Sequence, residues 1–460
     1  MKKKLIKAAC LLGAVVMACC GFTACAKFDP ANPGDYFAIP EYADDTQISI
    51  GGFCGPSWYV MNERSWEDAF KEAKEQGFTV LYPSDFQMDF GVDPESAMEY
   101  MDLAYKYGMK VYVNDTSLGV PHLDGDINAD KWDTAAAKEY TKHPAFAGVH
   151  LIDEPSYMRF DALGAKQKKW NEEFPDKMLL INLFPGYAGP TVLGGSFNSY
   201  LDNFIDTVKP DILHFDHYAV YADGSLGITY FSEHAKVAAK AKEADIPSGC
   251  YLMTTGHETG RFEYKRMQPT SYLRWQMAVS MTFGFKHITH YAFDPPWGGG
   301  YEATGYDHFY TDGEKNSLWH SVTEVNNEVL KWDNVYMNFD WIGTAPVVSP
   351  GNANLMFNVM EDGRIEPNEI KGVKSIVPTG DVLCGVFEDA NSNTGYMITN
   401  ATNPADELDV WTEVTFDKAY KGVLVYEKGV PAVMELDDDN KAVIALESGE
   451  GKFVIPLKKK

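Results

Sequence analysis

The sequence is poor in cysteine and in basic residues. Of its 7 cysteines, only Cys54, Cys250 and Cys384 lie beyond position 25. They are widely spaced and odd in number, which excludes a legible disulfide framework or zinc cluster, so an ordinary hydrophobic core must supply the stability. Lysine and arginine number 40 against 66 aspartates and glutamates. The resulting net charge of −26 disfavours binding to nucleic acid.

Long apolar runs are also missing. The one apolar run near the N-terminus, residues 8–22, is shorter than the ~20 residues that a membrane span needs. It follows a segment with four lysines, residues 1–7, and ends in small residues and a cysteine. This pattern predicts an export signal rather than a part of the fold.

The signal resembles that of bacterial lipoproteins, in which the cysteine after the cleavage point receives a lipid. The resemblance implies a signal peptide over 1–25, a lipid on Cys25 and a polar tether over 26–45; Cys19 is the competing acceptor. The expected location is a bacterial cell surface, with the membrane contacted through the lipid only. The alternative is a signal peptide that is cleaved to leave a soluble product.

Between residues 46 and 338, short β-rich apolar runs alternate with amphipathic helical stretches. Such alternation predicts parallel strands with helices outside them. Helix boundaries are marked by Ser65 before one stretch and by Asp93-Pro94 before another, with Gly77 and Gly108 after them. The expected strands are 48–52, 79–82, 110–113, 148–152, 178–182, 212–215, 249–253 and 287–291.

Eight strand–helix units in succession close best into a (β/α)₈ barrel, the TIM-barrel fold of the α/β class. The rival is an open doubly wound sheet, which usually has a glycine-rich phosphate turn before its first helix. Gly51, Gly52 and Gly55 follow the first strand, but Pro56 and Trp58 come next instead of a helix start. We therefore interpret those glycines as a loop.

From residue 339 to 460 the pattern changes to short alternating segments separated by turn residues. The segments 382–388, 396–400, 412–416, 422–426 and 452–457 are expected to be antiparallel strands, with a hairpin loop at 391–395. The C-terminal part is thus predicted to be a small β-sandwich.

Polar residues follow the expected barrel strands, where active sites of this fold lie. They are Trp58 after the first strand, Asp85 after the second, Asn114 after the third, Asp153 and Glu154 after the fourth, Asn182 after the fifth, Asp216, His217 and Tyr218 after the sixth, His257 and Glu258 after the seventh, and Asp294 and Trp297 after the eighth. We expect them to converge on one rim of the barrel.

The most specific motif is Asp153-Glu154-Pro155, in which an apolar strand ends abruptly in two carboxylates. It resembles the end of the fourth strand in the clan of barrel glycoside hydrolases that includes β-galactosidases and cellulases. That resemblance implies that Glu154 is the acid/base residue. Burial and the neighbouring Asp153 would raise the pKa of Glu154, as a proton donor requires.

The same clan places a second glutamate, the nucleophile, at the end of strand seven. Glu258 is the nearest match, but it lies five residues beyond the expected strand; Asp216, which ends strand six directly, is the competitor, and the third alternative is that neither serves. Carboxyl groups ~5–5.5 Å apart imply retention of configuration, and ~6.5–9.5 Å apart imply inversion.

The remaining candidates would bind substrate. Trp58 and Trp297 follow neighbouring strands of a closed barrel, so both can offer a face to one sugar ring; each can equally be a packing lid. Asp85, Asn114, Asp153, Asn182, His217, Tyr218 and Asp294 are candidates for contacts to sugar hydroxyls. No cofactor or metal is expected.

The predicted function is hydrolysis of an extracellular glycan by two-carboxylate acid/base chemistry, with carbohydrate as the partner. One alternative is a non-catalytic glycan-binding lipoprotein on a barrel scaffold, and another is a barrel hydrolase that acts on a substrate other than sugar.

Overall fold

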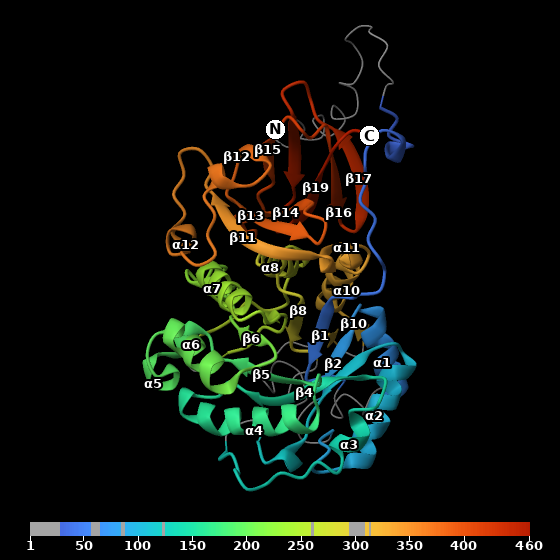
Figure 1. The fold of residues 1–460 in the computed structure, drawn as a ribbon, viewed down its shortest axis with the longest axis vertical. Coiled ribbons are helices and arrows are strands. Elements are labelled where there is room, and N and C mark those ends of the chain that lie inside the picture. The colour runs from blue at the N-terminus through green and yellow to red at the C-terminus, as the bar shows by residue number, and fades with distance from the viewer. Residues whose placement is uncertain are drawn as a thin grey trace.

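The computed structural model describes residues 28–56, 65–83, 88–121, 125–258, 262–293, 309–311 and 314–460. In these ranges the chain forms a barrel of parallel strands and, above it in Figure 1, a pair of antiparallel sheets. No helix among the described residues is both long enough and apolar enough to cross a bilayer.

Eight parallel strands close into a ring, in which β8 pairs with β1 between Ser49↔His287 and Gly52↔His290. This confirms the predicted (β/α)₈ barrel. Each expected strand overlaps an observed one. The observed strands are β1 (Ser49–Phe53), β2 (Val80–Tyr82), β3 (Lys110–Val113), β4 (Phe146–Asp153), β5 (Met178–Leu183), β6 (Leu213–Asp216), β7 (Ser248–Met253) and β8 (His287–Tyr291).

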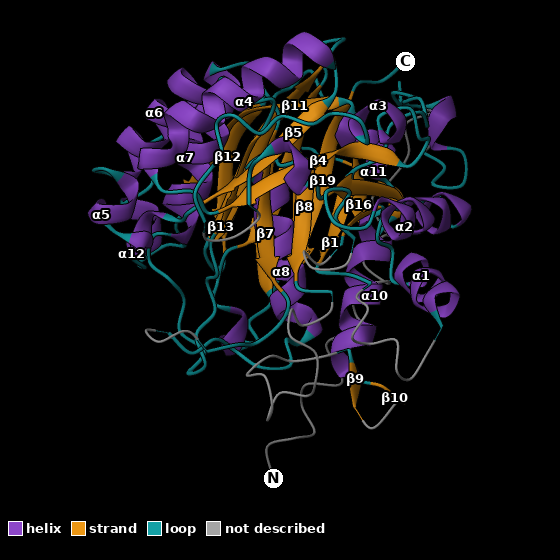
Figure 2. Ribbon diagram, turned by 90° about the horizontal axis from the view of Figure 1, so that it is seen from below, coloured by secondary structure: helices purple, strands orange, loops and turns teal. Residues whose placement is uncertain are grey.

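Helices surround these strands (Figure 2), and several begin where the sequence predicted. The Ser65 hydroxyl accepts the backbone N–H of Asp68 at 3.1 Å, and Asp93 accepts that of Ser96 at 3.1 Å. The helices are α1 (Trp66–Glu75), α2 (Pro94–Lys106), α3 (Ala137–Tyr140), α4 (Phe160–Glu173), α5 (Pro190–Leu193), α6 (Phe197–Val208), α7 (Tyr230–Glu243), α8 (Thr270–Thr282), α10 (Ser317–Val329) and α11 (Asp333–Met337). A short strand pair, β9 (Tyr310–Thr311) and β10 (Glu314–Lys315), precedes α10.

The C-terminal part is the predicted sandwich, with more strands than the sequence pattern revealed. One sheet has the order β11-β13-β14-β19-β16-β17 and the other β12-β15-β18. The strands are β11 (Phe339–Val347), β12 (Val373–Pro378), β13 (Val382–Asp389), β14 (Thr394–Asn400), β15 (Val410–Phe416), β16 (Gly422–Glu427), β17 (Val430–Glu435), β18 (Lys441–Leu446) and β19 (Gly451–Leu457). The short helix α12 (Leu355–Asn358) follows β11. A separate apolar core lies between the two sheets.

The N-terminal segment that the sequence predicted as a tether is packed along the sandwich from residue 28 onward. Phe37 is fully buried and forms an antiparallel backbone β-bridge with Lys459. The Tyr42 hydroxyl donates a hydrogen bond to Asp389 at 3.0 Å. Figure 1 shows this segment running down the side of the sandwich to β1. Residues 1–27, including Cys19 and Cys25, lie outside the described residues.

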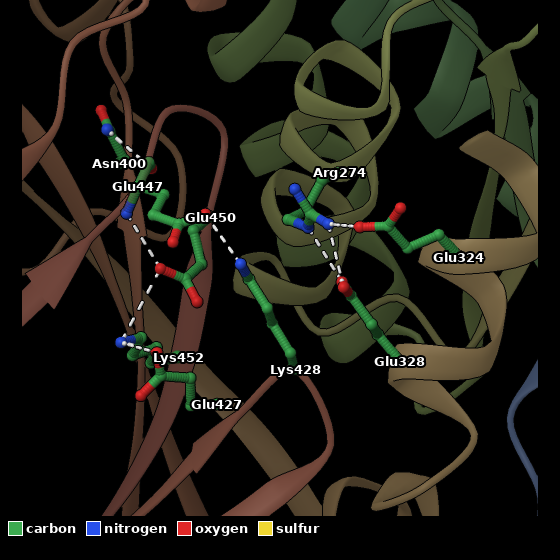
Figure 3. Close-up of polar contacts among 9 residues, drawn as sticks. All are labelled: Arg274, Glu324, Glu328, Asn400, Glu427, Lys428, Glu447, Glu450 and Lys452. Carbon is green, nitrogen blue, oxygen red and sulfur yellow. Dashed lines mark hydrogen bonds and ion pairs between the residues drawn. The ribbon is translucent and has the colours of Figure 1, made fainter. Parts of the chain in front are cut away.

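The sandwich rests on α8, and polar groups line the edge of this interface (Figure 3). Arg274 on α8 binds both carboxylate oxygens of Glu328 on α10, at 2.8 and 2.9 Å. On the sandwich side, Lys428 contacts Glu447 at 2.7 Å, and Glu450 is 2% exposed. Further inside, the Thr282 and Thr399 hydroxyls hydrogen-bond at 2.7 Å across the interface.

Gly385 on β13 packs closely against the C-terminal end of α8. A Cβ at this position would collide with the backbone carbonyl oxygen of Thr282. We expect Gly385→Val to lower the free energy of unfolding by about 1–3 kcal/mol, the usual cost of overpacking. Urea denaturation measures this. Gly34→Val is the control, because nothing lies within 4 Å of a Cβ at Gly34. Equal stability of both variants would contradict the close packing of the two units.

Candidate active site

Strand β4 delivers two consecutive carboxylates to one pocket. Side chains alternate between faces in a regular strand, so Asp153 and Glu154 should point apart. Instead Glu154 has φ +44°, in the left-handed region, and both residues line the same pocket. The backbone is held there because the Glu154 N–H donates to the Asn182 carbonyl at 2.9 Å, while the Tyr200 hydroxyl donates to the Pro155 carbonyl at 2.7 Å. Strain of this kind costs about 1–3 kcal/mol and often marks functional sites.

The Asn182 amide on β5 joins the carboxylates of the neighbouring strands. Its Nδ2 donates to Asp153 at 2.8 Å and to Asp216 at 3.1 Å. Its Oδ1 lies 2.9 Å from Nδ1 of His214. Burial holds the pKa of His214 well below its usual range, so the imidazole is neutral and donates from Nδ1 to this oxygen. That bond fixes the orientation of the amide, and the NH₂ group faces the two acids.

Glu154 and Asp216 hydrogen-bond directly to each other. Burial is the largest cause that raises the pKa of each, followed by the neighbouring negative charges: Asp216 and Asp153 for Glu154, and Asp153 for Asp216. The pKa of Glu154 is raised well above 4.5, and that of Asp216 to about 8. No lysine or arginine is among the described residues that line the pocket. The pair therefore holds a shared proton near neutral pH.

Aromatic side chains form the other walls of this pocket, whose volume is about 220 Å³. The rings of Tyr218 and Tyr291 lie 5.3 Å apart, and the hydroxyls of Tyr187 and Tyr264 are 3.4 Å apart. The aromatic lining residues are Tyr187, Tyr218, Tyr251, Phe262, Tyr264 and Tyr291, with His257 beside them. Aromatic walls around a few converging polar groups are typical of a small-molecule site.

Six of the residues predicted from strand ends line the pocket together: Asp153, Glu154, Asn182, Asp216, Tyr218 and His257. His217 lies behind it: its ring meets that of Tyr187 edge-on at 5.2 Å, and its Nδ1 contacts Glu233 at 2.9 Å. Glu233 also accepts the Gly186 N–H at 2.9 Å, so His217 supports the loop that carries Tyr187.

Two predicted residues lie elsewhere. Asn114 does not line the pocket; it is buried, and its Nδ2 donates to the Pro83 carbonyl at 3.0 Å, which ties together the ends of β2 and β3. Glu258 is exposed and forms an isolated backbone β-bridge with Glu263 in the loop after β7. The acid next to Glu154 in the structure is therefore Asp216 and not Glu258. Trp58, Asp85, Asp294 and Trp297 lie outside the described residues.

Most of the aromatic wall was not predicted from the sequence. Tyr251 and Tyr291 lie within strands, where an aromatic residue cannot be told from core by its sequence pattern. Tyr187 comes from a short 3-10 helix after β5 and Tyr264 from the segment after β7. Among the described residues, no group of three or more His, Cys, Asp or Glu is arranged to hold a metal ion.

No protein-family model and no curated protein matches the sequence. Solved structures do match. One is named glycoside hydrolase, with 13% identity, a TM-score of 0.53 and coverage of 93% of this chain and 98% of that one. Another is the β-galactosidase from Bacillus circulans sp. alkalophilus, with 10% identity, a TM-score of 0.50 and coverage of 90% and 99%. The likeness shows the fold alone.

The chain spans a smaller part of a third match, the β-galactosidase from the psychrophilic Marinomonas ef1. There the identity is 10%, the TM-score 0.43, and the match covers 63% of this chain and 60% of that chain.

The shared proton predicts how stability depends on pH. An acid whose pKa rises on folding stabilises the folded state at low pH and loses that contribution as the pH rises through the folded pKa. For Asp216 the window runs from 3.8 to about 8. We expect wild-type stability to fall across this window more steeply than that of the double variant Glu154→Gln, Asp216→Asn, which cannot titrate there. Urea denaturation across the window measures both. Parallel profiles would show that the pair does not bind a proton on folding.

Proposed function

We propose that this protein is a glycoside hydrolase, with Glu154 as the proton donor to the glycosidic oxygen. The observation that carries the proposal is the hydrogen-bonded pair of Glu154 and Asp216 at the carboxyl ends of β4 and β6, in a pocket walled by aromatic rings. A carboxyl that keeps its proton near neutral pH is the group that general acid catalysis requires. Aromatic faces suit the C–H faces of a sugar ring.

In this mechanism the substrate enters over the aromatic wall, and its glycosidic oxygen reaches the protonated carboxyl of Glu154. Proton transfer lets the leaving group depart as a neutral alcohol. Asp153 and Asp216, both held by Asn182, provide negative charge close to the oxocarbenium-like carbon of the transition state.

A non-catalytic glycan-binding protein is the second candidate. The spacing of the acids favours it. The carboxyl groups of a retaining pair lie ~5–5.5 Å apart and those of an inverting pair ~6.5–9.5 Å apart. Glu154 and Asp216 are closer than either, because they hydrogen-bond directly. Under that proposal the same pocket holds a sugar without cleaving it.

Glu154→Gln tests the catalytic proposal. Removal of a general acid should lower kcat/KM about 10²–10⁴-fold for a glycoside with a sugar leaving group. The loss should be much smaller for a 4-nitrophenyl glycoside, because nitrophenolate departs without a proton. Kinetics on a panel of disaccharides and aryl glycosides measures both losses. A merely structural role would reduce both rates equally.

Glu450→Gln is the matched control. Glu450 is also a buried glutamate whose pKa is raised by burial, but it lies at the sandwich interface. It should retain wild-type rates on both substrates. Binding of glycans by the wild type without any product would favour the second candidate.

We also propose that the protein is held on the outer side of a bacterial membrane by a lipid on Cys25. The basic segment 1–7, the short apolar run and the small residues before Cys25 support this location. Cys25→Ser should abolish incorporation of a labelled fatty acid and partition into detergent, whereas Cys19→Ser should leave both unchanged. The reverse result would assign the lipid to Cys19, and incorporation by neither protein would exclude the anchor.

A further inference from the structure

The carboxyl groups that line the pocket, among the described residues, come from one side of the barrel. Asp153 and Glu154 belong to β4 and Asp216 to β6, and Asn182 on the strand between them binds both aspartates. Since Glu154 and Asp216 also bind each other, the three acids form one cluster. Carboxylates that act on opposite faces of a sugar ring must be separated by the ring itself, at ~5 Å or more. This cluster therefore contacts a single edge of a sugar ring.

A single edge carries two adjacent substituents, the glycosidic oxygen on C1 and the group on C2. Two carboxyl groups within hydrogen-bond distance of each other match this pair of neighbours. Glu154 is protonated and suits the glycosidic oxygen. A carboxylate at Asp216 is an acceptor only, so the group on C2 must donate a hydrogen.

Tyr251 supplies a second and independent indication. Its side chain is 1% exposed and lines the pocket, yet no described residue forms a hydrogen bond with its hydroxyl. Tyr251 is the register partner of Asp216 across β6 and β7, so both side chains project to the same side of the sheet. A buried hydroxyl without a partner is costly, and a bound ligand that accepts its hydrogen removes the cost.

The ligand group must thus donate to Asp216 and accept from Tyr251. A secondary amide does both, with its N–H and its carbonyl oxygen. The aromatic rings around Tyr251 leave an apolar surface for the methyl group of an acetamide.

Resting on the hydrolase function proposed above, we propose that the substrates are 2-acetamido-2-deoxy-β-hexosides, and that the acetamido oxygen of the substrate takes the part of the nucleophile. Asp216 binds the amide N–H, Tyr251 binds the amide oxygen, and Glu154 protonates the leaving oxygen.

In the first step the amide oxygen forms a bond to C1 on the face opposite the leaving group. The bond between C1 and the glycosidic oxygen breaks, its electron pair stays on that oxygen, and the proton of Glu154 moves there. The amide proton stays on nitrogen or moves to Asp216, which leaves an oxazolinium ion or a neutral oxazoline.

In the second step water attacks C1, and the Glu154 carboxylate takes a proton from it. The bond between C1 and the amide oxygen breaks, its electrons return to the amide, and a proton that had moved to Asp216 returns to the nitrogen. The sum is the addition of water across the glycosidic bond with retained configuration, and no oxidant or reductant is needed. Two inversions at C1 account for the retention.

Wild-type kinetics on matched 4-methylumbelliferyl β-glycosides tests the proposal. A site built to pair an amide rejects the 2-hydroxy analogue, so kcat/KM should be about 10²-fold or more higher for the 2-acetamido glucoside and galactoside than for the parent glycosides. Replacing acetyl by mono-, di- and trifluoroacetyl weakens the carbonyl oxygen as a nucleophile, so kcat/KM should fall steeply along the series.

A flat fluoroacetyl series, or faster hydrolysis of the 2-hydroxy glycosides, overturns this inference and leaves the hydrolase proposal intact, because Glu154-dependent cleavage persists. Failure to hydrolyse any glycoside overturns both proposals.

Tyr251→Phe tests the second contact. The variant should fold with wild-type stability, since the lost hydroxyl has no hydrogen-bond partner among the described residues, and should lose about tenfold in kcat/KM on the acetamido substrates. Tyr82→Phe is the control: Tyr82 is another buried tyrosine of the barrel, it does not line the pocket, and its variant should keep wild-type kcat/KM. Equal losses in the two variants, or no loss in Tyr251→Phe, would overturn the role of Tyr251.

Discussion

The pairing of β8 with β1 is the constraint on which the site depends. Residues 49–52 and 287–290 run in parallel register and close the sheet into a ring. In a ring the inward side chains of successive strands converge, whereas in an open sheet they would diverge over a flat face. Closure is why Asp153 of β4, Asp216 of β6 and Tyr251 of β7 share one pocket. Closure also buries the acids away from water, and this burial raises their pKa values.

Burial away from water, rather than an ion pair, determines the pKa values of these acids. The histidine beside them is buried and neutral: burial holds the pKa of His214 well below its usual range. A neutral imidazole orients the Asn182 amide but contributes no positive charge. With no cationic side chain among the described lining residues, a proton is the remaining counter-charge for Glu154 and Asp216. The basic-poor composition of the chain is consistent with such a site.

The sequence predicted most of the barrel because glycines, prolines and caps mark its strand and helix ends. The motif Asp153-Glu154-Pro155 could also be recognised from the sequence, since core packing does not require two acids after an apolar strand. The edge strand β17 was not, because it is largely exposed and contains Pro431, which erases the alternation. The sequence could not decide whether Glu258 or Asp216 accompanies Glu154 in the pocket. Four residues separate Glu258 from the end of β7, and only tertiary contacts decide where such a loop turns.

The sandwich domain acts on the pocket through α8. The two units enclose that helix, so 10 of its 13 residues are buried, including the polar Gln276. Gln276 donates to the carbonyl of Met253 at 3.0 Å and accepts its N–H at 2.9 Å, which fixes the last residue of β7. Tyr251 lies two residues earlier on the same strand. The contacts of Thr282 with Thr399 and of Arg274 with Glu328 therefore hold in place the helix that positions this wall of the pocket. The C-terminal domain thus supports strand β7 through its contacts with α8.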